Sequence, residues 1–297
     1  MPIGRDGSPL FDTVAIVGVG LIGGSLGMAA RRRGVARRVI GIGRTEQKLM
    51  HAKILGAIDD YSMDIEHGAA EADLIILCTP VKLVAPTLKK MAPSLKQGAI
   101  ITDAGSTKFE IVQQCENVTP AGRFFVGGHP MAGSEQTGVN AARADLFLGA
   151  TYVLTPGFGT DLTALSKMTE FAGAIGAHVE ILSPEEHDEA VAVISHLPHA
   201  IAAGLMRLAE DSHRNNGKTF GLAAGSFRDL TRIADSSPEL WRDICLSNAG
   251  PLAQSITDLQ KALDELKSAL VTHDAQAIER FFEQARQTRE TYLRISR

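Results

Sequence analysis

A histidine stands in a glycine-rich stretch of this sequence, residues 127–133 (GGHPMAG), directly after the apolar residues Phe124–Val126. The apolar run predicts a strand, and the glycines and proline that follow it predict a loop at the strand end. Imidazole changes its charge near neutral pH, so His129 is a candidate general base. A loop histidine that only bonds the backbone would leave the same pattern, and the residues alone favour neither interpretation.

Other polar residues that could bind a ligand lie in the second half of the chain. Ser195 and His199 are four residues apart, which predicts that they share one helical face, and Pro198 predicts a kink between them. The alternative is that both pack inside a helical core. A planar guanidinium can hold a carboxylate through two hydrogen bonds, and Arg232 and Arg228 are the candidates. An ion pair with a surface acid would explain either arginine.

The pattern GxGxxG lies near the N-terminus, in residues 18–23 (GVGLIG). It follows a β-branched run, Thr13–Val17, and opens an amphipathic segment, Leu21–Arg33. In this strand–turn–helix context the motif binds the pyrophosphate of a dinucleotide at the helix N-terminus. A glycine turn with a purely structural role is the alternative. The context therefore predicts a dinucleotide-binding domain.

The end of the second predicted strand, Val39–Ile42, bears on which dinucleotide binds. NAD enzymes carry an acid there for the ribose 2′-hydroxyl, but this chain has Gly43, Arg44 and Thr45. Arg44 could pair with a 2′-phosphate, which favours NADP+ over NAD+, although it could also stack on the adenine or lie in solvent. The loops after two later strands should border the ligands as well. The predicted cofactor-binding residues are Gly18, Gly20, Leu21, Ile22, Gly23, Arg44, Thr45, Thr79 and Pro80.

The chain changes character near Ser183. Apolar runs alternate with helical patterns before it, which predicts an α/β domain with a parallel, doubly wound sheet. Ser183-Pro184-Glu185 is typical of a helix start, and no convincing strand follows it. We therefore expect a Rossmann-type domain over residues 1–182 and an all-helical domain over residues 183–297. The low charge of residues 190–206 predicts a helix that is buried on most sides.

The composition argues against several classes of protein. The 297 residues carry a formal net charge of −4, whereas nucleic-acid binding needs clustered lysine and arginine. Cys78, Cys115 and Cys245 are too far apart for a metal site, and so sparse a set fits a reducing compartment. Val14–Ala30 is apolar but contains five glycines. We expect no membrane span, no metal, and a cytoplasmic location.

Five motifs, in order along the chain, resemble those of the prephenate and arogenate dehydrogenase family. They are VGVGLIGGSL (17–26), DAGSTK (103–108), GGHPMAGSEQTG (127–138), SHLPH (195–199) and FRDLTRIADSSPELWRDI (227–244). The resemblance implies a Rossmann-type domain, a helical domain that forms a homodimer, and a monofunctional enzyme. It implies oxidative decarboxylation of a small-molecule substrate, prephenate or arogenate, in tyrosine biosynthesis, with hydride transfer to NAD(P)+. Which of the two substrates is used stays open.

The resemblance also implies roles for individual residues. His129 would accept the proton of the ring hydroxyl, and Ser106 would hydrogen-bond near that hydroxyl unless it is only a turn or helix cap. The implied substrate-binding residues are Ser195, His199, Arg232, Glu135 and Asp229. The two acids would pair near the mouth of the site. Trp241 would lie close to the pocket or simply in the core.

Two other functions remain open from the sequence. A two-domain 3-hydroxy acid dehydrogenase would share the fold and the glycine pattern, but it would use a lysine of the helical domain. Lys218 is the only lysine between Lys167 and Lys261, and its glycine-flanked setting predicts a loop. A dinucleotide-sensing protein without turnover would need the glycine pattern but not His129 and Arg232 together.

Overall fold

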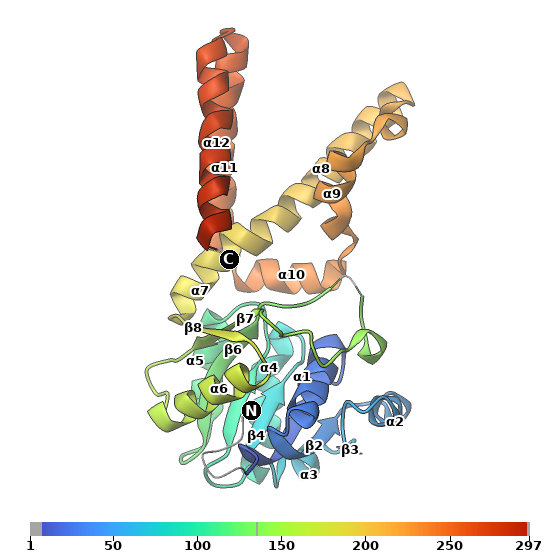
Figure 1. The fold of residues 1–297 in the computed structure, drawn as a ribbon, viewed down its shortest axis with the longest axis vertical. Helices are drawn as coiled ribbons and strands as arrows, with labels where there is room; N and C mark the ends of the chain where they lie inside the picture. Colours follow the sequence, from blue (N-terminus) through green and yellow to red (C-terminus); the bar gives the residue numbers. More distant parts are fainter. Residues whose placement is uncertain (1–7, 135, 296–297) are drawn as a thin grey trace. The chain divides into compact units, whose positions relative to one another are not determined.

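The computed structural model describes residues 8–134 and 136–295, and in these ranges one sheet of eight strands is covered by helices on both faces (Figure 1). The chain divides into two compact units, one that ends at Asn248 and one that begins at Ala249. The boundary predicted at residues 182 and 183 lies inside the first unit, between the last strand and the helix that follows it. It remains a prediction.

The strand order across the sheet is β3-β2-β1-β4-β5-β6-β7-β8. The strands are β1 (Phe11–Val17), β2 (Ala36–Ile42), β3 (Asp60–Ser62), β4 (Leu74–Leu77), β5 (Ile100–Asp103), β6 (Phe124–Pro130), β7 (Thr151–Thr155) and β8 (His178–Ile181). The predicted parallel, doubly wound sheet is confirmed from β1 to β6, whereas β7 pairs antiparallel with β6. Among its described residues, the link from β6 to β7 has a short 3-10 turn, η3 (Val139–Ala141), and no α-helix, whereas a parallel crossover usually contains one.

Helices connect the strands and then form the rest of the chain. Those that alternate with the strands are α1 (Leu21–Arg32), α2 (Glu46–Ile54), α3 (Ile65–Ala69), α4 (Val84–Met91), α5 (Phe109–Val118) and α6 (Leu162–Ala174). Those that follow the sheet are α7 (Pro184–Val191), α8 (Leu197–Asn216), α9 (Gly225–Thr231), α10 (Pro238–Ser247), α11 (Ala249–Val271) and α12 (Ala275–Ile295). The predicted all-helical composition after residue 183 is confirmed for the described residues.

The sheet is buried on both faces, because successive side chains of its central strands enter two different cores. Ile16 and Ile76 pack with Leu26 of α1 on one face. Their neighbours Val17 and Leu77 pack on the other face with the helices α4 and α5. Burial on both faces explains why the central strands are continuous apolar runs rather than alternating ones.

Glycines let α1 approach the end of β1 and the turn after α2 closely. A Cβ atom on Gly23 would lie 2.2 Å from the carbonyl oxygen of Gly18, and one on Gly27 would lie 2.1 Å from that of Ala57. Gly18 itself has a φ of +92°, a conformation that side chains other than glycine rarely adopt. The helix N-terminus is therefore held directly against the end of β1.

The helical segment after β8 differs from two expectations. The kink predicted at Pro198 is a π-helical turn, η4 (Ala192–His196), just before α8. The helix was expected to be buried on most sides, but Val193 and Ile194 are 55% and 66% exposed. These apolar side chains therefore belong to a surface that no other part of the described chain covers. By length and composition alone, Pro184–Asn216 would also qualify as a membrane span, which was not expected, although soluble core helices pass the same test.

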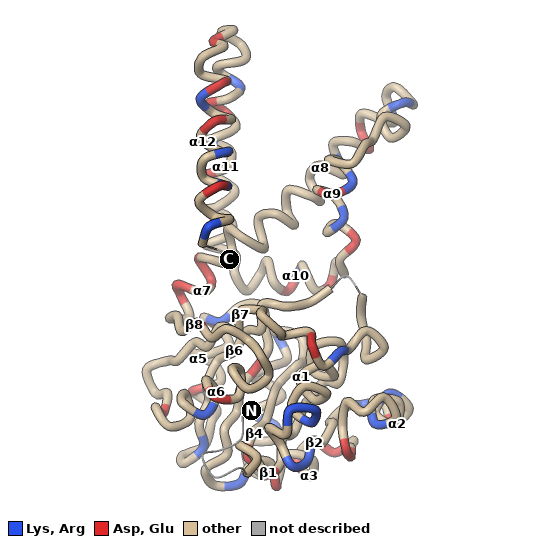
Figure 2. The backbone as a smooth tube through the Cα atoms, in the orientation of Figure 1, with Lys and Arg blue, Asp and Glu red and all other residues tan. Residues whose placement is uncertain are grey.

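The second unit consists of α11 and α12, which lie side by side as a helical hairpin (Figure 1). Lysine and arginine alternate with acids along both helices (Figure 2). Arg286, for example, pairs with Glu283 and Glu290 at 2.7 and 2.9 Å. Such exposed pairs contribute little to stability, and their main effect is to keep this face of the hairpin hydrated.

Candidate active site

The carboxyl ends of the parallel strands meet at one edge of the sheet, where open α/β sheets bind their ligands. A cavity of about 520 Å³ lies between the end of β1 and the end of β4. Among the predicted cofactor residues it is lined by Gly18, Gly20, Arg44, Thr45, Thr79 and Pro80. Leu21, Ile22 and Gly23 do not line it. The two apolar side chains pack on the core instead, and Gly23 sets the approach of α1.

The cavity suits a dinucleotide in shape and charge. Nothing in the described structure lies within 4 Å of a Cβ built on Gly20, so the turn leaves open space there. The first turn of α1 carries no acid, and its N–H groups and partial positive charge are available to phosphate. Lys48 and Lys90 join Arg44 in the lining. Three cations in the lining of the cavity fit a phosphate-bearing ligand better than a neutral one.

His129 lies in β6 rather than in a loop, so the predicted loop is wrong for residues 127–130, and the chain leaves the strand only after Pro130. It stands opposite Val153 of β7 in the antiparallel pair. The glycines before it allow close packing inside the sheet, because a Cβ on Gly127 would lie 2.3 Å from Oγ1 of Thr155 and one on Gly128 would lie 2.8 Å from the carbonyl oxygen of Asp103. The side chain of His129 is partly exposed at the carboxyl edge.

Two residues that sequence reasoning missed hold the His129 ring. Nδ1 of His129 lies 2.8 Å from Nε2 of His187, and Nδ1 of His187 lies 2.7 Å from Oδ1 of Asp188. Both partners come from α7 and are buried. The only signal in the sequence was the pair His187-Asp188 within a charged helix start, where an exposed face is the usual interpretation.

Asp188 also caps α5. Its two carboxylate oxygens accept the backbone N–H groups of Lys108 and Phe109, at 2.7 and 2.9 Å. The first turn of a helix leaves such donors unsatisfied, and a carboxylate at that end is stabilised by the helix dipole as well. Ser106, partly buried in the loop between β5 and α5, is thus not the cap of this helix.

A buried ion pair joins the ends of β5 and β6. Nζ of Lys108 donates to Oδ2 of Asp103, and it also donates to the carbonyl oxygen of Gly128 at 2.8 Å. Asp103 accepts the backbone N–H groups of Gly105 and Gly128, at 2.8 and 3.1 Å. Neither charged side chain is exposed to solvent. The arrangement fixes the backbone immediately before His129.

The electrostatic surroundings keep His129 neutral. Burial among protein atoms lowers the pKa of His129 well below its ordinary value, and the nearby positive charge of Lys108 and the rings of His187 and His196 lower it further. A neutral imidazole can accept a proton at physiological pH. The site therefore presents a base and not an acid at the sheet edge.

A second cavity, of about 260 Å³, lies among the helices and contains two predicted site residues. His199 and Trp241 line it, and their rings stack with centroids 3.9 Å apart. Nδ1 of His199 donates to the carbonyl oxygen of Ser195 at 2.8 Å, so Ser195 contributes its backbone. The position of Trp241 in the lining supports the interpretation that it lies close to the pocket.

Two buried donors near this cavity have no hydrogen-bond partner among the described residues, namely Nε1 of Trp241 and Nε2 of His196. Burial lowers the pKa of His196 to about 4, so the ring is neutral. Asn248 donates its amide to Nδ1 of His196 at 3.1 Å, which leaves the proton of the ring on Nε2. Unpartnered buried donors are costly, so both are suited to an acceptor such as a carboxylate.

The remaining predicted site residues lie on exposed helical surface. Arg232 begins the turn η6 (Arg232–Asp235), whose next two residues line the second cavity, while Asp229 is exposed on α9. Arg228 bonds the carbonyl oxygen of Ala223 at 3.3 Å. Glu135 lies outside the described residues.

Comparisons with known proteins assign the chain to a family. The model of the prephenate dehydrogenase nucleotide-binding domain matches residues 26–181, and that of the prephenate dehydrogenase dimerization domain matches residues 183–284. The chain belongs to the prephenate dehydrogenase family. It is 39% identical to a prephenate dehydrogenase of Bacillus subtilis, over 94% of this chain and 76% of that protein. Its expected function, as a prephenate or arogenate dehydrogenase of tyrosine biosynthesis, is confirmed at the level of the family.

Two solved structures of this family resemble the fold closely. The Aquifex aeolicus prephenate dehydrogenase, crystallised with hydroxyphenyl propionate and NAD+, aligns with a TM-score of 0.87 and 34% identity over 96% of this chain and 98% of its own. The Synechocystis arogenate dehydrogenase aligns with a TM-score of 0.83 and 33% identity over 94% and 99%. Membership in the prephenate dehydrogenase family decides against both alternatives, the 3-hydroxy acid dehydrogenase and the sensor without turnover. The protein is an oxidoreductase with a nucleotide-binding domain.

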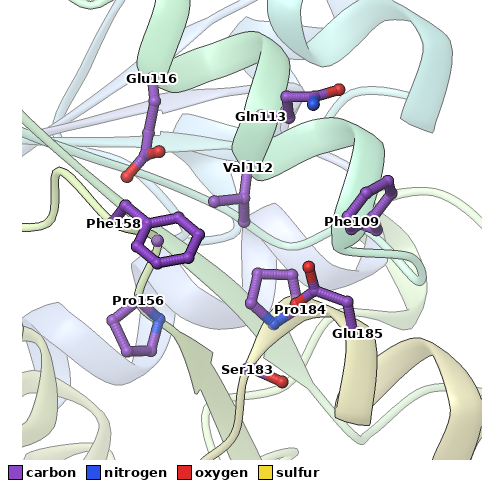
Figure 3. A pocket seen from close by; sticks show the side chains of 10 residues that line it. Phe109, Val112, Gln113, Glu116, Pro156, Phe158, Ser183, Pro184 and Glu185 are labelled. Carbon is purple, nitrogen blue, oxygen red and sulfur yellow. The ribbon is translucent and has the colours of Figure 1, made fainter.

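A third cavity of this prephenate dehydrogenase family member, of about 310 Å³, lies apart from the site. Figure 3 shows Phe109 and Val112 of α5 on one side of it and Pro156 and Phe158, from the turn after β7, on the other. None of the predicted site residues within the described ranges lines it.

The buried ion pair gives a stability prediction. Lys108→Met leaves the Asp103 carboxylate buried without its cation, and we expect the free energy of unfolding to fall by about 3 kcal/mol, near the lower end of the usual cost because two backbone donors remain. Urea denaturation measures the change. Lys53→Met is the matched control, because Lys53 reaches Asp60 only at 3.5 Å on the surface and such pairs contribute about 0–1 kcal/mol. Equal losses in the two variants would show that the buried pair has no special role.

Proposed function

We propose that the protein oxidatively decarboxylates prephenate, that NADP+ is the preferred hydride acceptor, and that His129 is the general base. The observation that carries this proposal is a neutral, partly exposed imidazole at the same sheet edge as a dinucleotide-shaped cavity. Relatives named prephenate dehydrogenase, 39% and 37% identical over more than nine-tenths of the chain, support prephenate as the ring substrate. Arogenate is the competing substrate.

The reaction needs a base that accepts a proton in one step and returns it in a later one. Prephenate carries a hydroxyl and a hydrogen on one ring carbon, and a carboxylate on the carbon across the ring. A bound nicotinamide supplies the acceptor for the hydride that leaves the first carbon. His129 accepts the hydroxyl proton, the second carbon loses CO2, and the ring becomes aromatic. The proton then returns from His129 to the phenolic oxygen, so the overall reaction neither releases nor consumes a proton.

The substrate's carboxylates need donors, and the helices offer them. We propose that Arg232 and the unpartnered indole N–H of Trp241 donate to these carboxylates from the second cavity. His199, whose Nδ1 already donates to the carbonyl oxygen of Ser195, binds substrate through the rest of its ring. The support is that η6, α8 and α10 all contribute to its lining. Side-chain contacts between η1 (Val81–Leu83) and α10, such as Lys82 with Asp243 at 3.3 Å, attach these helices to the sheet edge. Ser106, Ser195, Asp229 and Glu135 stay predictions from the sequence.

Removal of the base is the direct test of this mechanism. His129→Asn should lower kcat by about 10²–10⁴, the usual contribution of a general base, while cofactor affinity stays unchanged. In the wild-type protein, kcat/KM should fall only as the pH drops well below 6.5, because the lowered pKa keeps the imidazole neutral down to that range. A pH series of NADPH formation, with prephenate and with arogenate, measures both. An unchanged kcat in the variant would refute the mechanism.

Cofactor choice is tested at Arg44. If its guanidinium pairs with the 2′-phosphate, Arg44→Ser should raise the KM for NADP+ by about tenfold or more and leave that for NAD+ nearly unchanged, because charge-assisted pairs contribute about 1.5–3 kcal/mol. Arg37→Ser is the control, since Arg37 pairs with Asp12 on the surface and does not line the cavity. Equal effects on both dinucleotides would mean that Arg44 does not bind the 2′-phosphate.

We also propose that the protein is a cytoplasmic homodimer formed through its helical domain. The dimerization-domain match and the exposed apolar side chains of η4 and α11, among them Ile194 and Leu263, support the dimer. Leu263→Arg should shift the sedimentation mass from two chains toward one, because it buries a charge at the interface. Leu162→Arg, on the exposed surface of α6 in the other domain, should leave the dimer intact. A dimer that survives both changes would have to form elsewhere.

A further inference from the structure

The contacts of the His129 ring form a chain that ends at a helix N-terminus. Nδ1 of His129 meets Nε2 of His187 at 2.8 Å, and Nδ1 of His187 meets Oδ1 of Asp188 at 2.7 Å. Asp188 in turn accepts the first two backbone N–H groups at the start of α5. Each link is at hydrogen-bond distance, and His187 and Asp188 are buried.

The donor and acceptor in each of these hydrogen bonds can be assigned by starting from the carboxylate of Asp188. The carboxylate of Asp188 receives backbone donors on both oxygens, an arrangement that stabilises its ionised form, which can only accept. Nδ1 of His187 must therefore donate to it, which leaves Nε2 of a neutral His187 as an acceptor. Nδ1 of His129 must then carry the proton that fills this bond. The other nitrogen of His129, Nε2, is left with its lone pair.

We propose that His187 and Asp188 are positioning residues that fix the tautomer of His129, so that Nε2 is always the proton acceptor. The proposal rests on the role of His129 as the base and deepens it. A free imidazole exchanges its proton between the two nitrogens, and a base with its proton on the wrong nitrogen cannot react. The hydrogen bond to His187 holds His129 in one tautomer, and the hydrogen bond to Asp188 holds His187 in one tautomer.

The charged and titratable groups around the ring fit this role. Lys108, before α5, faces the cluster and is paired with Asp103 of β5, while His196 of η4 is neutral and is bound by Asn248. The hydrogen bonds of the His129 ring lead through His187 to the carboxylate of Asp188, which can stabilise the transient positive charge on His129 after proton transfer. His187 lies between that carboxylate and His129, so the carboxylate stabilises the positive charge on His129 through the two hydrogen bonds of His187.

Two substitutions at one position separate positioning from packing. In His187→Gln the side-chain oxygen reaches the place of Nε2 and can still accept from Nδ1 of His129. In His187→Asn the shorter amide can still donate to Asp188, but it cannot reach His129. Asp188 itself is a poor target, because its replacement would also remove the cap of α5.

We expect His187→Asn to lower kcat by about 10- to 100-fold, a part of what a general base supplies, with KM and the NADP+ dissociation constant within about twofold of wild type. His187→Gln should retain kcat to within a few-fold. Circular dichroism and thermal melting check that both variants are folded. Wild-type kcat in the asparagine variant, or equal losses in the two, would overturn the proposal.

A spectroscopic measurement covers the case in which the variants do not fold. In wild-type protein labelled with ¹⁵N-histidine, the nitrogen shifts of His129 should report a protonated Nδ1 and an unprotonated Nε2 at neutral pH, with His129→Asn identifying the resonances. The opposite tautomer, which would arise if a doubly protonated His187 donated to His129, would refute the proposal. This reading needs no substrate, so it holds even if turnover of prephenate and arogenate should both fail, which would refute the proposed function alone.

Discussion

The site depends on the hydrogen bonds that the carboxylate of Asp188 accepts. It caps α5 at the edge of the sheet and accepts the Nδ1–H of His187, and the side chain of Asp188 is buried. Its backbone carbonyl accepts the amide of Asn248 at 2.7 Å, and the same amide holds His196. One residue of α7 thus ties the sheet edge to the helices that carry the second cavity.

The elements with local signals were predictable from the sequence. The glycine pattern, the strand before it and the helix after it could be placed because each glycine does a local task, such as the positive φ of Gly18. His129 could be singled out by its type and neighbours. Its strand could not, because Gly127 and Gly128 are also typical of loops, and only their packing against Thr155 and Asp103 shows why glycine is needed.

The parts that could not be predicted depend on contacts between distant residues. Asp188 meets Lys108 across 80 residues, and His129 meets His187 across 58. No periodicity or spacing records such a pair. A buried Lys108 was hidden for a similar reason, since a lysine after a turn is normally assigned to the surface, and its burial follows only from Asp103 and the carbonyl of Gly128. The reversal of β7 likewise depended on how the long link after β6 returns to the sheet.

The place of His129 inside a strand has a consequence for how such an enzyme can diversify. A base on a loop moves whenever the loop is lengthened or shortened, but a base in register with Val153 of a neighbouring strand keeps its position through such changes. The cavity with His199 and Trp241 is built by helices that follow the sheet in sequence. Mutations in those helices can adapt the cavity to the keto side chain of prephenate or the amino acid side chain of arogenate, while the position of His129 for proton transfer stays the same.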